Sequence, residues 1–155
     1  SRRGYNIDSF SAGVTADPRF TRITVVSSGD EQILEQIEKQ LNKKLDVIKV
    51  KTFDADSSIS RELMLIKVKY NKTNRRDIME ICEIMNAQIV DMSKNMMLIQ
   101  MCDIPERTQL LIDMFQSVSI VEVARTGTLA LQKCTENIKR RKKKMYNIDK
   151  IMDKC

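Results

Sequence analysis

The order of predicted strands and helices constrains this chain more than any other feature of its sequence. From residue 61 onward, segments with apolar residues at every second position alternate with segments whose apolar residues are three and four positions apart, patterns typical of strands and of helices. The predicted elements are a strand at 61–70, a helix that ends at Met85, strands at 87–93 and 96–102 that form a hairpin, a helix that begins at Pro105, and a strand at 118–125. This is the order of a ferredoxin-like βαββαβ unit.

The first half of the chain predicts the same order with two elements missing. A strand is expected at 5–15, a second at 19–27, a helix that ends near Lys44, and a strand at 45–53. In a ferredoxin-like sheet the first strand lies between the third and the fourth, so its absence leaves two rows of backbone donors and acceptors unpaired. We expect that the sequence is a fragment or that another chain completes this unit, and the first explanation is favoured.

These patterns divide the chain into four expected parts. They are an incomplete first domain at 1–53, a short polar linker at 54–60, a second ferredoxin-like domain at 61–132, and a basic tail at 133–155. The predicted fold class is α+β, with two units in tandem. A hydrophobic content of 42% suffices to bury a core, and no apolar stretch approaches the roughly 18 residues of a membrane helix, so we expect no membrane partner.

The sequence lacks the residue patterns that most enzymes need. It contains no histidine, the commonest general base and metal ligand, and its four glycines form no phosphate-binding loop. The cysteines at 82, 102, 134 and 155 lack the short paired spacing of a metal site or disulfide framework, and suit a reducing cytosol. We therefore predict no catalytic residues and no metal-binding residues in this chain.

The net charge of +6 comes from the C-terminal end alone. Residues 1–132 hold 18 basic and 18 acidic residues, whereas residues 133–155 hold nine basic and three acidic residues. The run at 139–144 favours a solvated, disordered tail, and contact with nucleic acid or another anionic partner is the alternative. Nucleic acid is the weaker expectation, because Tyr146 alone could stack on a base. Beyond the run, Met145, Ile148, Ile151 and Met152 have the spacing of a short amphipathic helix.

Four separated segments carry a family resemblance. They are Arg3-Gly4-Tyr5-Asn6-Ile7, residues 30–41 (DEQILEQIEKQL), residues 61–67 (RELMLIK) and residues 120–127 (IVEVARTG). Together and in this order they resemble the small, regulatory subunit of acetolactate (acetohydroxyacid) synthase, from residue 1 to about residue 131. The resemblance implies two tandem ferredoxin-like units, of which the first is an N-terminally truncated ACT domain, a small ligand-sensing module.

The resemblance also implies a function. Such a subunit is non-catalytic: it activates a catalytic subunit and confers feedback inhibition by a branched-chain amino acid, most often valine, in valine, leucine and isoleucine biosynthesis. Thiamine diphosphate, magnesium and FAD would belong to the catalytic partner, so no cofactor is expected here. The implied protein is cytoplasmic and forms a homodimer through its ACT units. The competing hypothesis is an ACT-like module that binds nucleic acid or an anionic partner through the basic tail.

Within this resemblance, Asn6 and Ile7 are the expected effector-binding residues. The Asn6 amide would hold the charged end of the amino acid, and Ile7 would offer its backbone and apolar surface. The alternative is that Asn6 only ends a turn before a strand. The family loop that forms the other wall of the site is not found in this sequence. The segment Arg125-Thr126-Gly127 also resembles the family and is assigned no role.

Overall fold

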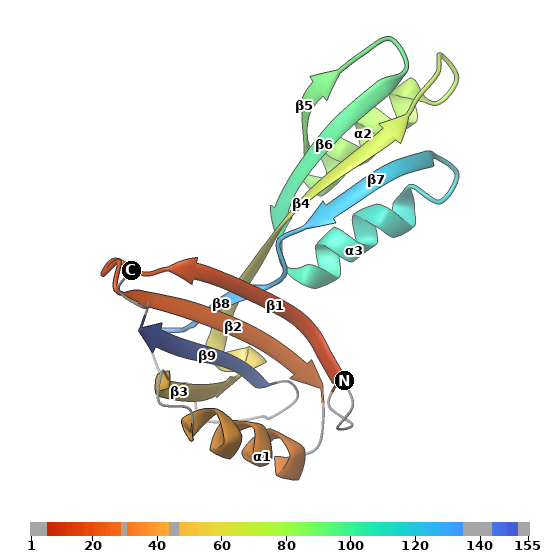
Figure 1. Ribbon diagram of the computed structural model, residues 1–155. Helices are drawn as coiled ribbons and strands as arrows, with labels where there is room; N and C mark the ends of the chain where they lie inside the picture. The colour runs from red at the N-terminus through yellow and green to blue at the C-terminus, as the bar shows by residue number, and fades with distance from the viewer. Residues whose placement is uncertain (1–5, 29–30, 44–46, 135–143, 152–155) are drawn as a thin grey trace. The chain divides into compact units, whose positions relative to one another are not determined.

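The structure is a computed structural model that describes residues 6–28, 31–43, 47–134 and 144–151. The chain forms two compact units, one of residues 1–60 and 127–155 and the other of residues 61–126. The described residues contain three α-helices, and the strand pairs with a described register are antiparallel (Figure 1). The predicted α+β class is confirmed.

The unit of residues 61–126 follows the predicted order of elements. They are β4 (Ser58–Lys69), α2 (Arg75–Met85), β5 (Gln88–Met92), β6 (Met96–Asp103), α3 (Pro105–Met114) and β7 (Ser119–Arg125), with the first three residues of β4 in the other unit. The strand order is β5-β6-β4-β7, so β4 lies in the centre. Both helices lie on one face of this sheet (Figure 1).

Buried and exposed side chains alternate along β4, which explains why helices cover only one face of that sheet. Met64, Ile66 and Val68 are fully buried, whereas the residues between them are exposed or half-buried. The buried set continues on the neighbouring strands and helices, and its members include Ile78, Cys82, Met85, Met97, Ile99, Met101, Leu111 and Phe115. Each large apolar side chain buried in this way stabilises the fold by about 1.5–3 kcal/mol.

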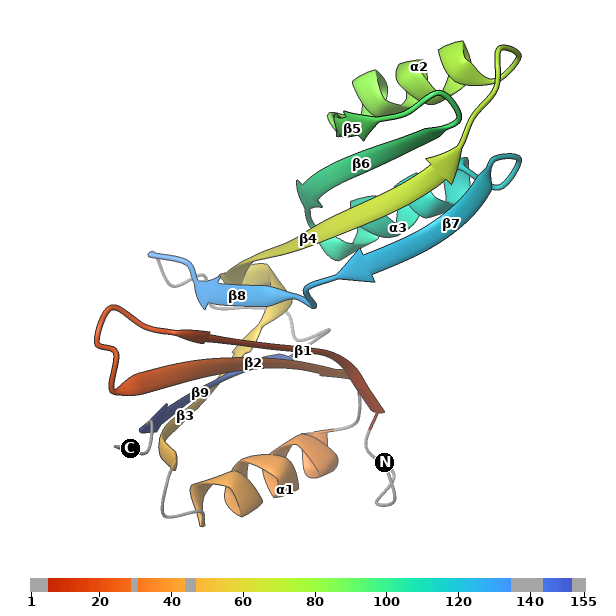
Figure 2. The same ribbon diagram turned by 45° about the horizontal axis from the view of Figure 1, so that its top comes forward.

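The unit that contains the N-terminal strands has a second sheet. Its elements are β1 (Asn6–Val14), β2 (Phe20–Ser28), α1 (Glu31–Asn42), β3 (Val47–Asp54), a short 3-10 turn η1 (Ala55–Ser57), β8 (Leu129–Gln132) and β9 (Lys144–Ile151). The strand order is β1-β2-β9-β3. Figure 2 shows α1 on one side of this sheet and β8 on the other. Val26 of β2 and Ala130 of β8 are buried together on the β8 side.

β9 corrects two expectations from the sequence. Residues 144–151 form a strand, not the predicted amphipathic helix, and this strand fills the position that was expected to be empty. An apolar spacing of three residues in so short a segment is compatible with either structure. The strand is favoured because it pairs its backbone groups with β2 and with β3.

The expected part boundaries also differ from the observed units. Residues 127–132 were expected in the second domain, but they belong to the unit that contains β1, because β8 packs there against Val26. The expected linker at 54–60 contains η1 and the start of β4. The sequence could not reveal β8, because its four residues carry no periodicity long enough to predict an element.

Candidate functional site

The two expected effector residues lie at the start of an edge strand. Asn6 and Ile7 open β1, opposite Ser28 and Ser27 of β2. β1 stands at one end of the strand order, so among the described residues its outer backbone groups face no other strand. An edge of this kind can pair with an extended segment of another chain. Asn6 and Ile7 are therefore consecutive residues at the start of an edge strand, and among the described residues no strand pairs with its outer side.

The segment that follows β7 contacts β1 at Ser9 and Phe10, further along the strand. The backbone N–H of Thr128 donates a hydrogen bond of 2.6 Å to the Ser9 hydroxyl. Gly127 has a φ of +82°, and a Cβ atom there would collide with the carbonyl oxygen of Phe10. Glycine is required at this position because it alone adopts this backbone without strain and leaves room for the strand. The Arg-Thr-Gly segment, which the sequence left without a role, thus ends in a close approach to β1.

A cavity of about 340 Å³ lies on the same unit, between the β1–β2 hairpin and β8. Its lining includes Ser11, Gly13, Arg22, Thr24 and Ala130. This volume is at the lower end of the range of small-molecule sites. Neither Asn6 nor Ile7 lines it, so the cavity and the expected effector site are distinct.

The unit of residues 61–126 contains a buried ion pair. Glu62 on β4 is almost fully buried, and Arg125 on β7 donates to both of its carboxylate oxygens, from Nε to Oε1 at 2.8 Å and from Nη2 to Oε2 at 3.0 Å. The Thr108 hydroxyl of α3 donates to Oε2 at 2.7 Å, and Arg125 Nη1 donates to Gln109 Oε1 at 3.1 Å. The cluster therefore joins two strands and a helix.

The charges of this cluster stabilise each other. Burial alone would raise the pKa of Glu62, but the hydrogen bonds from Arg125 and Thr108 outweigh burial and lower that pKa. The hydrogen bond to Glu62 raises the pKa of Arg125. Both groups stay charged at neutral pH, so Glu62 cannot serve as a general acid. The cluster is structural, and the sequence did not reveal it because its two ends are 63 residues apart.

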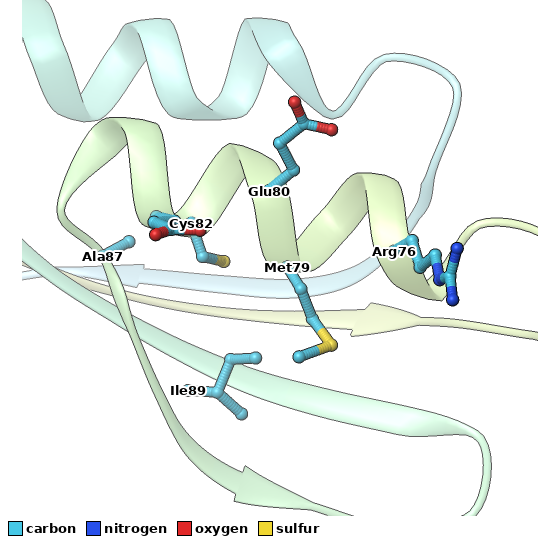
Figure 3. A pocket seen from close by; sticks show the side chains of 7 residues that line it. Arg76, Met79, Glu80, Cys82, Ala87 and Ile89 are labelled. Carbon is cyan, nitrogen blue, oxygen red and sulfur yellow. The ribbon is translucent and has the colours of Figure 1, made fainter.

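A shallow groove runs along α2 beside β5, with a volume of about 460 Å³. Met79, Cys82 and Ile89 form apolar parts of its lining, and Arg76 and Glu80 add charge. Figure 3 shows the Met79 side chain extending toward Ile89, while Glu80 points away from it. Burial raises the pKa of the Cys82 thiol to about 11, so this cysteine remains protonated and is a poor nucleophile.

The described part of the chain contains no cluster that suggests metal chemistry. Within residues 6–28, 31–43, 47–134 and 144–151, no three His, Cys, Asp or Glu side chains are grouped so that they could hold a metal ion. Among the same residues, no helix combines the length and apolarity that crossing a membrane would require.

Comparisons with known proteins match both halves of the chain. Residues 61–134 match the family model described as the small subunit of acetolactate synthase, and residues 1–49 match the model of the AHAS small subunit-like ACT domain. The acetolactate synthase small subunit of Mycolicibacterium smegmatis is 38% identical over 86% of this chain and 78% of its own length. The isozyme 3 small subunit of Escherichia coli is 36% identical over 86% and 82%.

The chain belongs to the acetolactate synthase small-subunit family. A solved structure of this family agrees: the small subunit from Thermotoga maritima superposes with a TM-score of 0.80 at 31% identity, covering 87% of this chain and 84% of that one. Members of this family are the small, regulatory subunits of acetolactate synthase, so this chain is a regulatory subunit involved in branched-chain amino acid biosynthesis. The family resemblance found in the sequence is confirmed.

Proposed function

We propose that this chain activates a separate acetolactate synthase catalytic subunit and makes it sensitive to feedback inhibition by a branched-chain amino acid. Valine is the proposed effector. The observation that carries the proposal is the match of two small-subunit family models, in order, to residues 1–49 and 61–134. The catalytic subunit would carry thiamine diphosphate, magnesium and FAD, and this chain is assigned no cofactor.

We infer two tandem ferredoxin-like units as the framework for this role. The strand order β5-β6-β4-β7 with two helices on one face supports the assignment for residues 61–126. The order β1-β2-β9-β3 with α1 supports it for the unit that contains β1. The first unit is the proposed sensor and corresponds to the ACT domain.

The proposed effector site lies at the start of β1. The Asn6 amide would bind the charged end of the amino acid, and Ile7 would border its aliphatic side chain. Two copies that pair along β1 about a two-fold axis would bring a second wall to this site. The exposure of Phe10 (58%) and Val14 (62%) on β1 supports such an interface, because both apolar side chains would be covered by it.

Inhibition by valine requires only a modest energy difference. Valine must bind better to the inhibited arrangement of the complex than to the active one. A tenfold change in activity corresponds to about 1.4 kcal/mol of differential binding. A few hydrogen bonds and one aliphatic contact at the start of β1 can supply this difference.

We place the protein in the cytoplasm. The described cysteines Cys82, Cys102 and Cys134 are free thiols, which suits a reducing compartment.

The test is an assay of acetolactate formation by the catalytic subunit of the same organism, with and without this chain and with and without valine. Stimulation that valine reverses is the expected result. A catalytic subunit that binds this chain, yet shows neither stimulation nor a response to any branched-chain amino acid, would contradict the proposal. Salt-dependent binding of nucleic acid that is lost when the basic residues at 139–143 are changed to glutamine would instead support the competing hypothesis.

A further inference from the structure

The sheet that contains β1 has a central strand from the other end of the chain. β9 lies between β2 and β3 and pairs antiparallel with both (Figure 1). Its pairing with β2 runs without interruption from Lys144, opposite Ser27, to Ile151, opposite Phe20. A strand in this position satisfies one row of backbone groups on each neighbour.

The unit of residues 61–126 has a central strand in the same position as β9. β4 lies between β6 and β7 and is antiparallel to both, just as β9 lies between β2 and β3. In this comparison the β1–β2 hairpin corresponds to β5–β6, α1 to α3, and β3 to β7. The two sheets therefore have one topology, but the central strand comes first along the chain in one unit and last in the other.

Apolar residue types match across the β9 ladders. Ile148 of β9 lies opposite Ile23 of β2 and Val50 of β3. Tyr146 lies opposite Val25. Pairs of apolar or aromatic residues at opposed positions stabilise antiparallel strands by about 0.2–1 kcal/mol each.

Charged residue types of opposite sign also match in the observed register. Asp149 lies opposite Arg22 of β2 and Lys49 of β3. A shift of one residue in one direction would place Lys150 opposite Arg22, and like charges at opposed positions are destabilising. The sequence of β9 thus fits this slot better in the observed register than in the adjacent one.

We propose that the space between β2 and β3 is a strand-binding site, that its occupant is residues 144–151 of the same chain, and that this strand holds the unit containing β1 together. Without it, two rows of backbone groups, one on β2 and one on β3, would lose their partners. The inference goes beyond the proposed regulatory function and needs neither a catalytic subunit nor an effector for its test.

The test is hydrogen exchange of the full chain, followed by mass spectrometry of peptides from each strand. Ile148→Pro removes a backbone donor in the middle of β9 and disfavours the strand. We expect exchange in β2 and β3 to become at least tenfold faster, while peptides from β5, β6 and α3 serve as an internal reference and stay unchanged. Lys142→Pro, which adds a proline to the run before β9, is the matched control and should leave β2 and β3 protected.

A second pair of variants tests the register without a proline. Asp149→Lys should speed exchange in β2 at least threefold, and adding Arg22→Asp should restore part of the protection. Equal exchange of β2 and β3 in the wild type, Ile148→Pro and Asp149→Lys would overturn the proposal. Protection of β2 and β3 that disappears on tenfold dilution of the wild type would also overturn it, because the strand would then come from a second copy.

Discussion

Arg125 on β7 holds the carboxylate of Glu62 on β4 in a two-pronged ion pair, with its Nε 2.8 Å from Oε1 and its Nη2 3.0 Å from Oε2. Glu62 is 4% exposed and Arg125 33% exposed, so the carboxylate has few other partners available to it. The Thr108 hydroxyl completes its hydrogen bonding. The pair therefore anchors the closing strand to the central strand and to α3.

We expect Arg125→Ala to lower the free energy of unfolding by about 2 kcal/mol. Removing one partner of a fully buried pair costs about 3–5 kcal/mol, and partial exposure of Arg125 reduces this value. The matched control is Glu122→Ala, which breaks the exposed 3.1 Å pair with Lys67 and should cost less than about 0.5 kcal/mol. Urea unfolding of both variants measures the difference, and equal losses would show that burial of Glu62 is unimportant.

The lowered pKa of Glu62 predicts how stability depends on pH. A carboxyl group whose pKa is depressed by folding adds stability that is complete above its ordinary pKa and is lost as the pH falls through the folded value. Glu62→Gln should therefore be less stable than the wild type at pH 7, and the gap should narrow between roughly pH 5 and pH 3. Unfolding free energies measured across this range give the gap directly. A gap that stays constant with pH would contradict the assignment.

Gly127→Ala should destabilise the unit that contains β1 by more than about 1 kcal/mol. The positive φ strains an alanine, and its Cβ would collide with the Phe10 carbonyl oxygen. Gly13→Ala is the matched control, since nothing lies within 4 Å of a Cβ there and its cost should stay below that of Gly127→Ala. Thermal unfolding of the two variants measures the difference. Similar unfolding midpoints would contradict the close approach of Gly127 to Phe10.

The cysteines should differ sharply in reactivity. Cys82 is buried and its thiol pKa is raised to about 11, so at pH 8 it should resist alkylation in the folded protein. Cys102 and Cys134 are exposed and should be modified under the same conditions. Peptide mass spectrometry after brief iodoacetamide treatment separates the sites. Labelling in denaturant provides the control, because Cys82 should then react as well.

Asn6→Ala should weaken inhibition by valine at least tenfold while stimulation of the catalytic subunit persists. The proposed amide contact to the amino acid would be lost, and the aliphatic contact would remain. Asn42→Ala, at the exposed end of α1, is the matched control. Valine should inhibit the complex that contains this variant as strongly as it inhibits the complex with the wild type. A titration of activity against valine for both variants makes the comparison. Unchanged inhibition in Asn6→Ala would place the effector elsewhere.

The family and most of the elements followed from the sequence by itself. Alternation at Met64, Ile66 and Val68 predicted a half-buried strand, and the structure has one there. Pro105 begins α3 as expected, because proline suits the first position of a helix. These features depend on residues near one another in the chain, where periodicity and backbone preference act directly.

Only the tertiary structure decided how distant segments pair. Met145 and Ile148 carry a spacing that suits a helix, yet β9 is a strand because β2 and β3 offer it two rows of hydrogen-bonding partners. The partners of Glu62 and the close approach of Gly127 to Phe10 likewise join residues far apart in sequence. Local pattern sets which elements a chain can form, whereas the need to pair buried backbone and charge selects which of them meet.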